Sequence, residues 1–134
     1  MIRFFDYFKD SFSYALLELE YHMIQSEGNL KLYFRDDIQV EKIDGGLELY
    51  YKRRLCLNTE ETPMLQVVYK VVFENSEKAD PSGLTQEEIH GALYDNALGA
   101  LDKVAARMSL LVGEIMFAGC NQPLILPPNV IREP

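Results

Sequence analysis

One long segment near the end of the chain constrains the fold more than any other. It opens at Thr85 and Glu88, whose spacing is that of a capping box, in which each side chain pairs with a backbone amide left free at a helix start. Apolar residues then recur every three or four positions until a glycine and a proline end the pattern. Residues 85–119 are therefore predicted to be helical, and Gly91 and Gly99 permit a kink or two shorter helices.

The second half of this segment is almost free of charge. Between residues 104 and 118 only Arg107 and Glu114 are charged. A helix that packs on one sheet needs one apolar stripe, whereas a helix that is apolar nearly all round needs cover on more than one side. Self-association of the chain is therefore predicted; an N-terminal segment folded over the helix remains the alternative. The expected interface residues are Ala105, Met108, Val112, Gly113 and Met116.

The chain before the helix carries the alternation of apolar and polar residues that is typical of strands. In the first of four such stretches the alternation changes phase, which predicts a β-bulge near residues 15–17. Whether residues 1–16 are helix or strand is left open by their pattern. Asp44-Gly45-Gly46 predicts a hairpin turn between the second and third strands, because glycine accepts the positive φ of tight hairpins.

Strands that precede a helical region, rather than alternate with it, indicate an α+β fold with a four-stranded antiparallel sheet followed by a long C-terminal helix. The chain of 134 residues is expected to form a single domain, 1–134. Within it we expect strands at about 12–74, a linker at 75–84, the helical region at 85–119 and an apolar tail at 120–134.

Composition excludes several classes of function. A net charge of −8 argues against nucleic-acid binding, which favours clustered lysine and arginine. Two cysteines without a pairing pattern predict reduced thiols and a cytoplasmic location. No apolar run has membrane-spanning length and the N-terminus does not resemble a signal peptide, so no membrane insertion is expected.

The sequence carries no recognised catalytic motif, so an enzyme, a cofactor or a metal site is not expected. His22 and His90 have no ligand partner at helical spacing and are interpreted as ordinary surface or edge residues. Asp36-Asp37 is interpreted as a bulge or turn, since adjacent strand residues point to opposite faces. Arg53-Arg54 is interpreted as part of a solvated sheet face.

The end of the chain resembles a known family. A glycine that ends the helix is followed by a proline-bearing apolar run, as in the SecB family of protein-export chaperones. The matching residues are Gly119, Pro123, Leu124, Leu126, Pro128 and Ile131. Ala106-Arg107 resembles an Ala-Arg pair in the family's helix, although it is displaced along the chain. The order of strands and helix resembles the family over nearly the whole chain.

The resemblance implies dimers that assemble into a tetramer, with long helices between two sheets. It also implies an ATP-independent holdase that binds unfolded polypeptides or preproteins in apolar grooves. Some members of the family deliver preproteins to the SecA motor, and others guard an antitoxin. This chain stops at Pro134, without the family's second helix and polar tail. That tail is one of the family's contacts with SecA. SecA is therefore suggested as a partner only by the order of the elements and the motif after the helix.

A client-binding groove is expected between the apolar tail and the sheet, together with the N-terminal aromatic residues. Its expected residues are Phe4, Phe5, Phe8, Tyr33, Tyr50, Leu124, Ile125 and Val130. The alternative is that the apolar tail residues pin the tail to the core. Three functions remain open: a holdase for non-native polypeptides, general or dedicated to one client; an interaction module that holds one folded partner; and a small-molecule carrier.

Overall fold

The computed structural model describes residues 2–21, 32–57, 63–120 and 130, apart from the side chains of residues 32, 57, 63, 64 and 116–120. A short helix comes first, four strands follow, and two helices with two 3-10 turns come last. The elements are α1 (Phe4–Tyr7), β1 (Phe8–Tyr21), β2 (Leu32–Ile43), β3 (Gly46–Leu57), β4 (Pro63–Asn75), η1 (Pro81–Gly83), α2 (Gln86–Asn96), η2 (Leu98–Leu101) and α3 (Asp102–Cys120).

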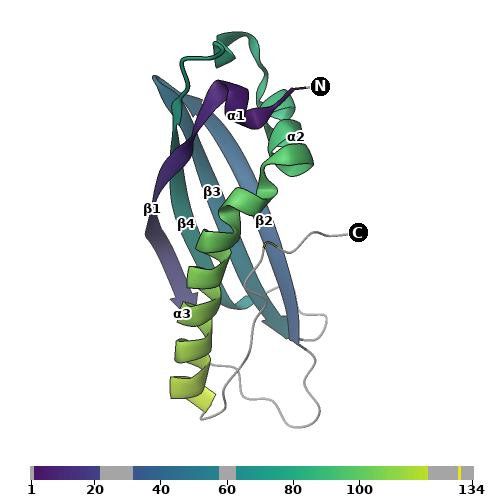
Figure 1. The fold of residues 1–134 in the computed structure, drawn as a ribbon. Coiled ribbons are helices and arrows are strands. Elements are labelled where there is room, and N and C mark those ends of the chain that lie inside the picture. The colour runs from purple at the N-terminus through teal and green to yellow at the C-terminus, as the bar shows by residue number, and fades with distance from the viewer. Residues whose placement is uncertain (1, 22–31, 58–62, 121–129, 131–134) are drawn as a thin grey trace.

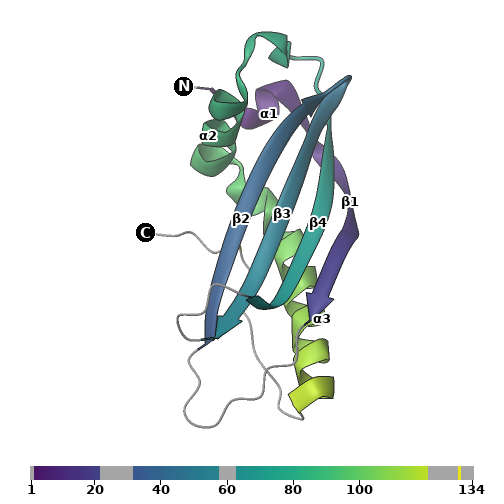
Figure 2. The same ribbon diagram turned by 180° about the vertical axis from the view of Figure 1, so that it is seen from behind.

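The four strands form one antiparallel sheet in the order β1-β4-β3-β2. The described helices lie on one face of this sheet, which we call the helix side (Figure 1). Figure 2 shows the other face, the open face, with no described helix across it. On β3, Leu47, Leu49 and Tyr51 are buried on the helix side, while the residues between them point to the open face. The α+β class predicted from the sequence is confirmed.

The hairpin between β2 and β3 has the turn that the sequence predicts. Gly45 has a φ of 79°, in the left-handed region that favours glycine. Gly46 approaches the backbone of β4 so closely that a Cβ atom there would lie 2.2 Å from the carbonyl oxygen of Phe73. Glycine is thus required at both positions, for two different reasons.

The first strand is interrupted where the sequence predicts a bulge. The pairing of β1 with β4 shifts register between Leu16 and Glu18, and again between Phe8 and Phe12. The open question about the N-terminal residues is also answered, since the short helix α1 leads directly into β1 at Phe8, earlier than the expected start near residue 12.

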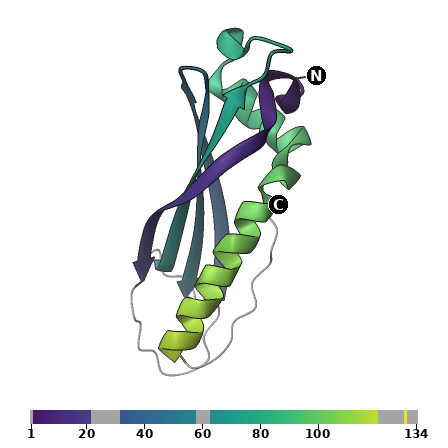
Figure 3. The same cartoon turned by 60° about the vertical axis from the view of Figure 1, so that its left-hand side comes forward.

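The helical region is divided in two, as its glycines permit. The capping box that begins α2 is confirmed: Glu88 N donates to Thr85 Oγ1 and Thr85 N donates to Glu88 Oε1, both at 3.1 Å. At the end of α2, Asn96 Oδ1 accepts from Phe4 N at 3.0 Å and Asn96 Nδ2 donates to Ile2 O at 2.9 Å. The N-terminal segment is therefore tied to α2 and leaves the uncharged half of α3 uncovered, as Figure 3 also shows.

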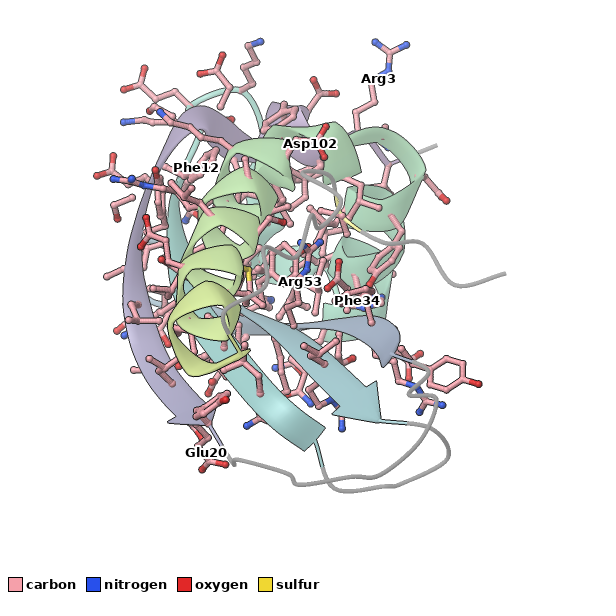
Figure 4. The ribbon with its side chains drawn as sticks, turned by 90° about the horizontal axis from the view of Figure 1, so that it is seen from below. Arg3, Phe12, Glu20, Phe34, Arg53 and Asp102 are labelled. Atoms are coloured by element: carbon pink, nitrogen blue, oxygen red, sulfur yellow. The ribbon has the colours of Figure 1, made fainter. Side chains whose placement is uncertain are left out.

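A buried ion pair lies between the sheet and α3. The side chains of Arg53 and Asp36 are 2% and 0% exposed. Arg53 Nε donates to Asp36 Oδ1 and Arg53 Nη2 to Asp36 Oδ2, each at 2.8 Å. Arg53 Nη1 also donates to Ser109 Oγ at 2.5 Å, and Tyr51 donates its hydroxyl to Asp36 Oδ2 at 2.7 Å. One guanidinium therefore joins β2, β3 and α3, as seen from below in Figure 4.

The same contacts fix the charges of this cluster. Burial alone lowers the pKa of Arg53, but hydrogen bonds and charge contacts with Asp36 and Tyr51 hold that pKa above its usual value. Burial and the negative charge of Asp36 raise the pKa of Tyr51. At neutral pH Arg53 is therefore charged, and Tyr51 keeps the proton that it donates to Asp36.

Two interpretations made from the sequence are wrong here. Asp36-Asp37 is neither a bulge nor a turn, because β2 pairs with β3 without a register shift from Leu32 to Ile43. Arg53 does not lie on a solvated face, because it faces Asp36 directly across the two strands on the helix side. Burying either charge alone would cost several kcal/mol of desolvation, so sequence reasoning places both in solvent. The strand register shows that Arg53 and Asp36 neutralise each other.

Replacing Arg53 with methionine should leave the carboxylate of Asp36 buried without its partner. We expect Arg53→Met to lower the free energy of unfolding, measured by urea denaturation, by about 3–5 kcal/mol. Arg35→Met, on the open face of β2, is the control and should change it by no more than about 0.5 kcal/mol. Equal effects of the two substitutions would contradict a structural role for the ion pair.

Candidate functional site

A groove lies on the helix side of the sheet, between the edge strand β1 and α3. Its volume is about 320 Å³. Strand residues form one wall and one exposed side of α3 forms the other. The lining residues are Tyr14, Ala15 and Leu16 of β1, Tyr69 of β4, and Arg107, Leu110, Leu111 and Glu114 of α3.

Two exposed leucines line this groove and two more follow on β1. In the described part of the chain, six large hydrophobic side chains are exposed, and four of them are Leu16, Leu17, Leu19 and Leu110, at 46%, 55%, 43% and 57%. We call these four residues the leucine cluster. A monomeric protein seldom leaves such residues together on its surface without a binding role. The leucine cluster is therefore the strongest sign of a binding surface on the helix side.

The bulge in β1 explains why so many leucines are exposed on one strand. Leu16 lies opposite Tyr69 and Leu19 lies opposite Val67, so both point to the helix side. Leu17 is the residue that the register skips. Since α3 leaves this end of β1 uncovered, the leucines on both sides of the bulge remain accessible.

The polar groups of the groove are few and sit at its borders. Arg107 and Glu114 lie on α3 on either side of Leu110 in the sequence, and both are exposed. Tyr14 and Tyr69 have ring centroids 6.1 Å apart. Burial raises the pKa of Tyr69, although the charge of Arg107 opposes this, so the hydroxyl is neutral at neutral pH. An open groove that combines leucines, two tyrosine rings, one cation and one anion suits an extended polypeptide segment with apolar side chains better than a small polar substrate.

No other chemistry is evident in the described residues. They contain no group of three or more His, Cys, Asp or Glu residues that could hold a metal ion. His90 Nε2 lies 3.1 Å from the carbonyl oxygen of Ile38, and its ring lies 4.6 Å from that of Tyr94, so this histidine connects α2 to β2. Cys56 is a buried free thiol. Among the described helices, none combines the length and the apolar character needed to cross a membrane.

The structure does not bring the expected groove residues together on one surface. Phe4 and Phe8 are each only 1% exposed and belong to the core, so their expected role as groove walls is corrected. Phe5 is half-buried against the same core. Tyr33 and Tyr50 point to the open face, away from the helices.

The tail can be followed at one residue. Val130 is half-buried against the core, and its N–H donates to Asp102 Oδ1 at 3.4 Å. This contact fits the alternative in which the tail is pinned to the core. Leu124 and Ile125 lie outside the described residues, so their part in a groove stays a prediction.

The expected interface residues mostly face inward. Ala105, Met108 and Val112 are 0%, 0% and 2% exposed because they pack on the sheet, which corrects their assignment to an intermolecular contact. Gly113 is half-buried, and the side chain of Met116 lies outside the described part of the chain. On the outward side of α3, Ala106, Leu110 and Gly113 form a stripe of their own.

Sequence reasoning missed the leucine cluster although its signal was present. Alternation cannot bury Leu16, Leu17 and Leu19 together, because any strand phase leaves at least one of them on the opposite face. A bulge brings neighbours to one face, but the strand then needs a cover as wide as its apolar surface. The sequence did not show that α3 leaves these leucines of β1 exposed.

Comparison with known proteins identifies the fold. No protein-family model matches the chain, and no curated protein matches it by sequence. Among solved structures, the chain is similar to the SecB-like chaperone Rv1957 of Mycobacterium tuberculosis in complex with a ChAD peptide from the Rv1956 HigA1 antitoxin. The TM-score is 0.56, the sequence identity is 14%, and the match covers 85% of this chain and 82% of that chain. The fold is therefore SecB-like, as the resemblance in the sequence predicts.

The leucine cluster should bind an apolar dye in the native state. We expect the double substitution Leu16→Ser with Leu110→Ser to reduce the fluorescence of bound 8-anilinonaphthalene-1-sulfonate severalfold, because the apolar area that holds the dye is lost. Ile43→Ser is the control, since Ile43 is exposed in β2 outside the leucine cluster. An equal loss of fluorescence with Ile43→Ser would show that the dye reports general surface hydrophobicity.

Proposed function

We propose that this protein binds extended apolar segments of other polypeptides in the groove between β1 and α3, as an ATP-independent chaperone of SecB-like fold. The observation that carries the proposal is the leucine cluster. Leu16 from a strand and Leu110 from a helix line the groove, Leu17 and Leu19 follow Leu16 along β1, and Arg107 and Glu114 are the charged residues of the lining. The proposed activity is binding, in which the groove shields the apolar side chains of a client from water.

The two elements that form the groove suit an extended client. β1 is an edge strand of the sheet in the described chain. An edge strand can pair through its backbone with an incoming extended segment, while alternate side chains of that segment reach the apolar wall. Leu16 supplies that wall from the strand, with Leu19 exposed further along the same face, and Leu110 supplies it from the helix.

A dedicated client is the more specific form of the proposal. The similar solved structure is a SecB-like chaperone in complex with a peptide from an antitoxin. Under this form the groove holds one defined segment of one partner, and the protein need not protect unrelated proteins. Delivery of preproteins to SecA is a further expectation that rests on the family resemblance alone.

Substituting Leu16 tests the client proposal. Full burial of a leucine contributes about 1.5–3 kcal/mol, and a client can bury only the part of Leu16 that is exposed, 46%, so Leu16→Ser should weaken binding of a labelled peptide with leucine at alternate positions by about threefold to tenfold. Fluorescence anisotropy measures this binding, and suppression of the aggregation of an unrelated denatured protein distinguishes a general from a dedicated client. Ile43→Ser should bind the peptide as the unsubstituted chain does. Unchanged affinity in Leu16→Ser, with the fold retained, would overturn the assignment of the groove.

Self-association is proposed on a neighbouring surface of α3. Ala106 and Gly113 are small residues seven positions apart on the outward side of α3, which allows a second helix to approach closely there while Leu110 stays with the groove. The residues expected from the sequence to form the interface are buried, so the interface is proposed on this outward surface instead. The reason is unchanged: the helix is apolar nearly all round, and one sheet covers only one side of it. A second copy of the chain is the partner proposed for it.

Light scattering at micromolar concentration tests self-association. We expect the mass of a dimer or tetramer for the unsubstituted chain. Gly113→Glu should reduce this mass to that of a monomer, because a charged side chain prevents close approach of the second helix. Lys103→Glu, an exposed change nearer the start of α3, is the control and should keep the assembly. A monomeric mass for the unsubstituted chain would reject the proposal.

A further inference from the structure

The open face of the sheet carries a compact group of cations at one end of β2 and β3. Arg35 lies directly opposite Arg54 in the register of the two strands, and Lys52 lies two residues from Arg54 on the same face. We call Arg35, Lys52 and Arg54 the cationic cluster. Tyr33 precedes Arg35 on the same face of β2 and is 45% exposed. Asp37 lies directly opposite Lys52 on the same face, so the surface combines three cations, one carboxylate and an accessible aromatic ring, with the excess positive charge at Arg35 and Arg54.

This arrangement is unfavourable for the isolated chain. Like charges directly opposite each other destabilise a pair of strands. The chain has 21 acidic and 13 basic residues, so carboxylates are plentiful. Yet in the described part of the chain the ion pairs use Lys9, Arg53 and Lys70 as cations, and none of them involves the cationic cluster.

The arginines also retain an unsatisfied donor. The Nε atom of Arg54 is buried and has no hydrogen-bond partner among the described residues. Its neighbour across the strands on β4 is Gln66, which donates instead to Glu18 Oε1 of β1 at 3.4 Å. Glu20 lies opposite Gln66 on β1 and Glu18 lies opposite Val68, so both carboxylates are two strands, about 10 Å, from the β3 arginine. Since Nε itself is shielded, a carboxylate from a partner would meet this guanidinium at its Nη atoms.

We propose that the cationic cluster is a docking surface for an acidic, extended segment of a partner polypeptide. A guanidinium donates two parallel hydrogen bonds to one carboxylate, and two arginines side by side can hold two carboxylates. In an extended segment, alternate side chains on one face are about 6.8 Å apart, which matches the spacing of Lys52 and Arg54 along β3, whereas Arg35 and Arg54 are about 5 Å apart across the strands. The ring of Tyr33 adds an apolar contact beside the charged ones.

Charge selects the class of partner. The net charge of −8 repels a nucleic-acid backbone, whose phosphates are closely spaced along the whole strand. A short acidic peptide can place its carboxylates on the cationic cluster and keep the rest of its length away from the acidic surface. Since the cluster and the groove lie on opposite faces of the sheet, this proposal does not depend on the proposed function.

A labelled acidic peptide tests the proposal. The probe is a fluorescein-labelled octapeptide in which glutamate alternates with glycine, and its binding is measured by fluorescence anisotropy at about 0.15 M salt. We expect the double substitution Arg35→Gln with Arg54→Gln to weaken binding about tenfold or more. The matched control is Arg3→Gln with Lys78→Gln, which removes the same charge from exposed residues elsewhere and should change affinity less than about twofold.

A second variant separates the bidentate contact from charge and guards against misfolding. Arg35→Lys with Arg54→Lys keeps the charge but loses the planar donors, so it should give an intermediate loss of affinity with an unchanged melting temperature.

Three other results would overturn the proposal. The first is an equal loss of affinity in Arg35→Gln with Arg54→Gln and in the control Arg3→Gln with Lys78→Gln. That result would mean that the peptide responds only to the overall charge of the protein. The second is competition by free glutamate as effective as that by the peptide at the same concentration of carboxylate. The third is tighter binding of a lysine peptide or of a single-stranded oligonucleotide of the same length.

Discussion

The helix side of the sheet is organised around the buried pair of Arg53 and Asp36. A buried charge without its partner costs several kcal/mol, so β2, β3 and α3 must keep these groups within hydrogen-bond distance. The bond from Arg53 to Ser109 fixes the rotation of α3 about its axis. With Ser109 turned toward the sheet, Met108 is buried on the same side and Leu110 faces outward. The bond from Arg53 and the buried apolar residues of α3 together determine which side of the helix forms the wall of the groove.

Local signals in the sequence predicted most of the fold. Alternation located the strands and the bulge near Leu16, and residue type located the hairpin at Gly45 and the capping box at Thr85. The inward charges were missed, because an alternation of apolar residues treats any charge as exposed. Alternation places Arg53 on the same face as Tyr51 and Leu55, but it cannot reveal that Asp36, on another strand, neutralises the charge when it is buried.

The candidate site was much less predictable. An all-round apolar helix shows that some residues need a further partner, but hydrophobicity alone cannot separate Met108, which is buried, from Leu110, which is exposed. The N-terminal aromatic residues were equally ambiguous: Phe4 enters the core because α1 is tied to Asn96 at the end of α2. Only the packing of the helices on the sheet distinguishes core from binding surface.

The helix side of the sheet offers an apolar groove and the open face offers cations. The binding of a polypeptide segment in the groove between β1 and α3 is the central claim. Backbone amide hydrogen exchange, followed with and without a peptide that has leucine at alternate positions, tests that claim most directly. The account predicts slower exchange in residues 14–19 of β1 and 107–114 of α3 when the peptide is added, with little change in β2 and β3. Slower exchange confined to β2 and β3, or none at all at saturating peptide, would contradict it.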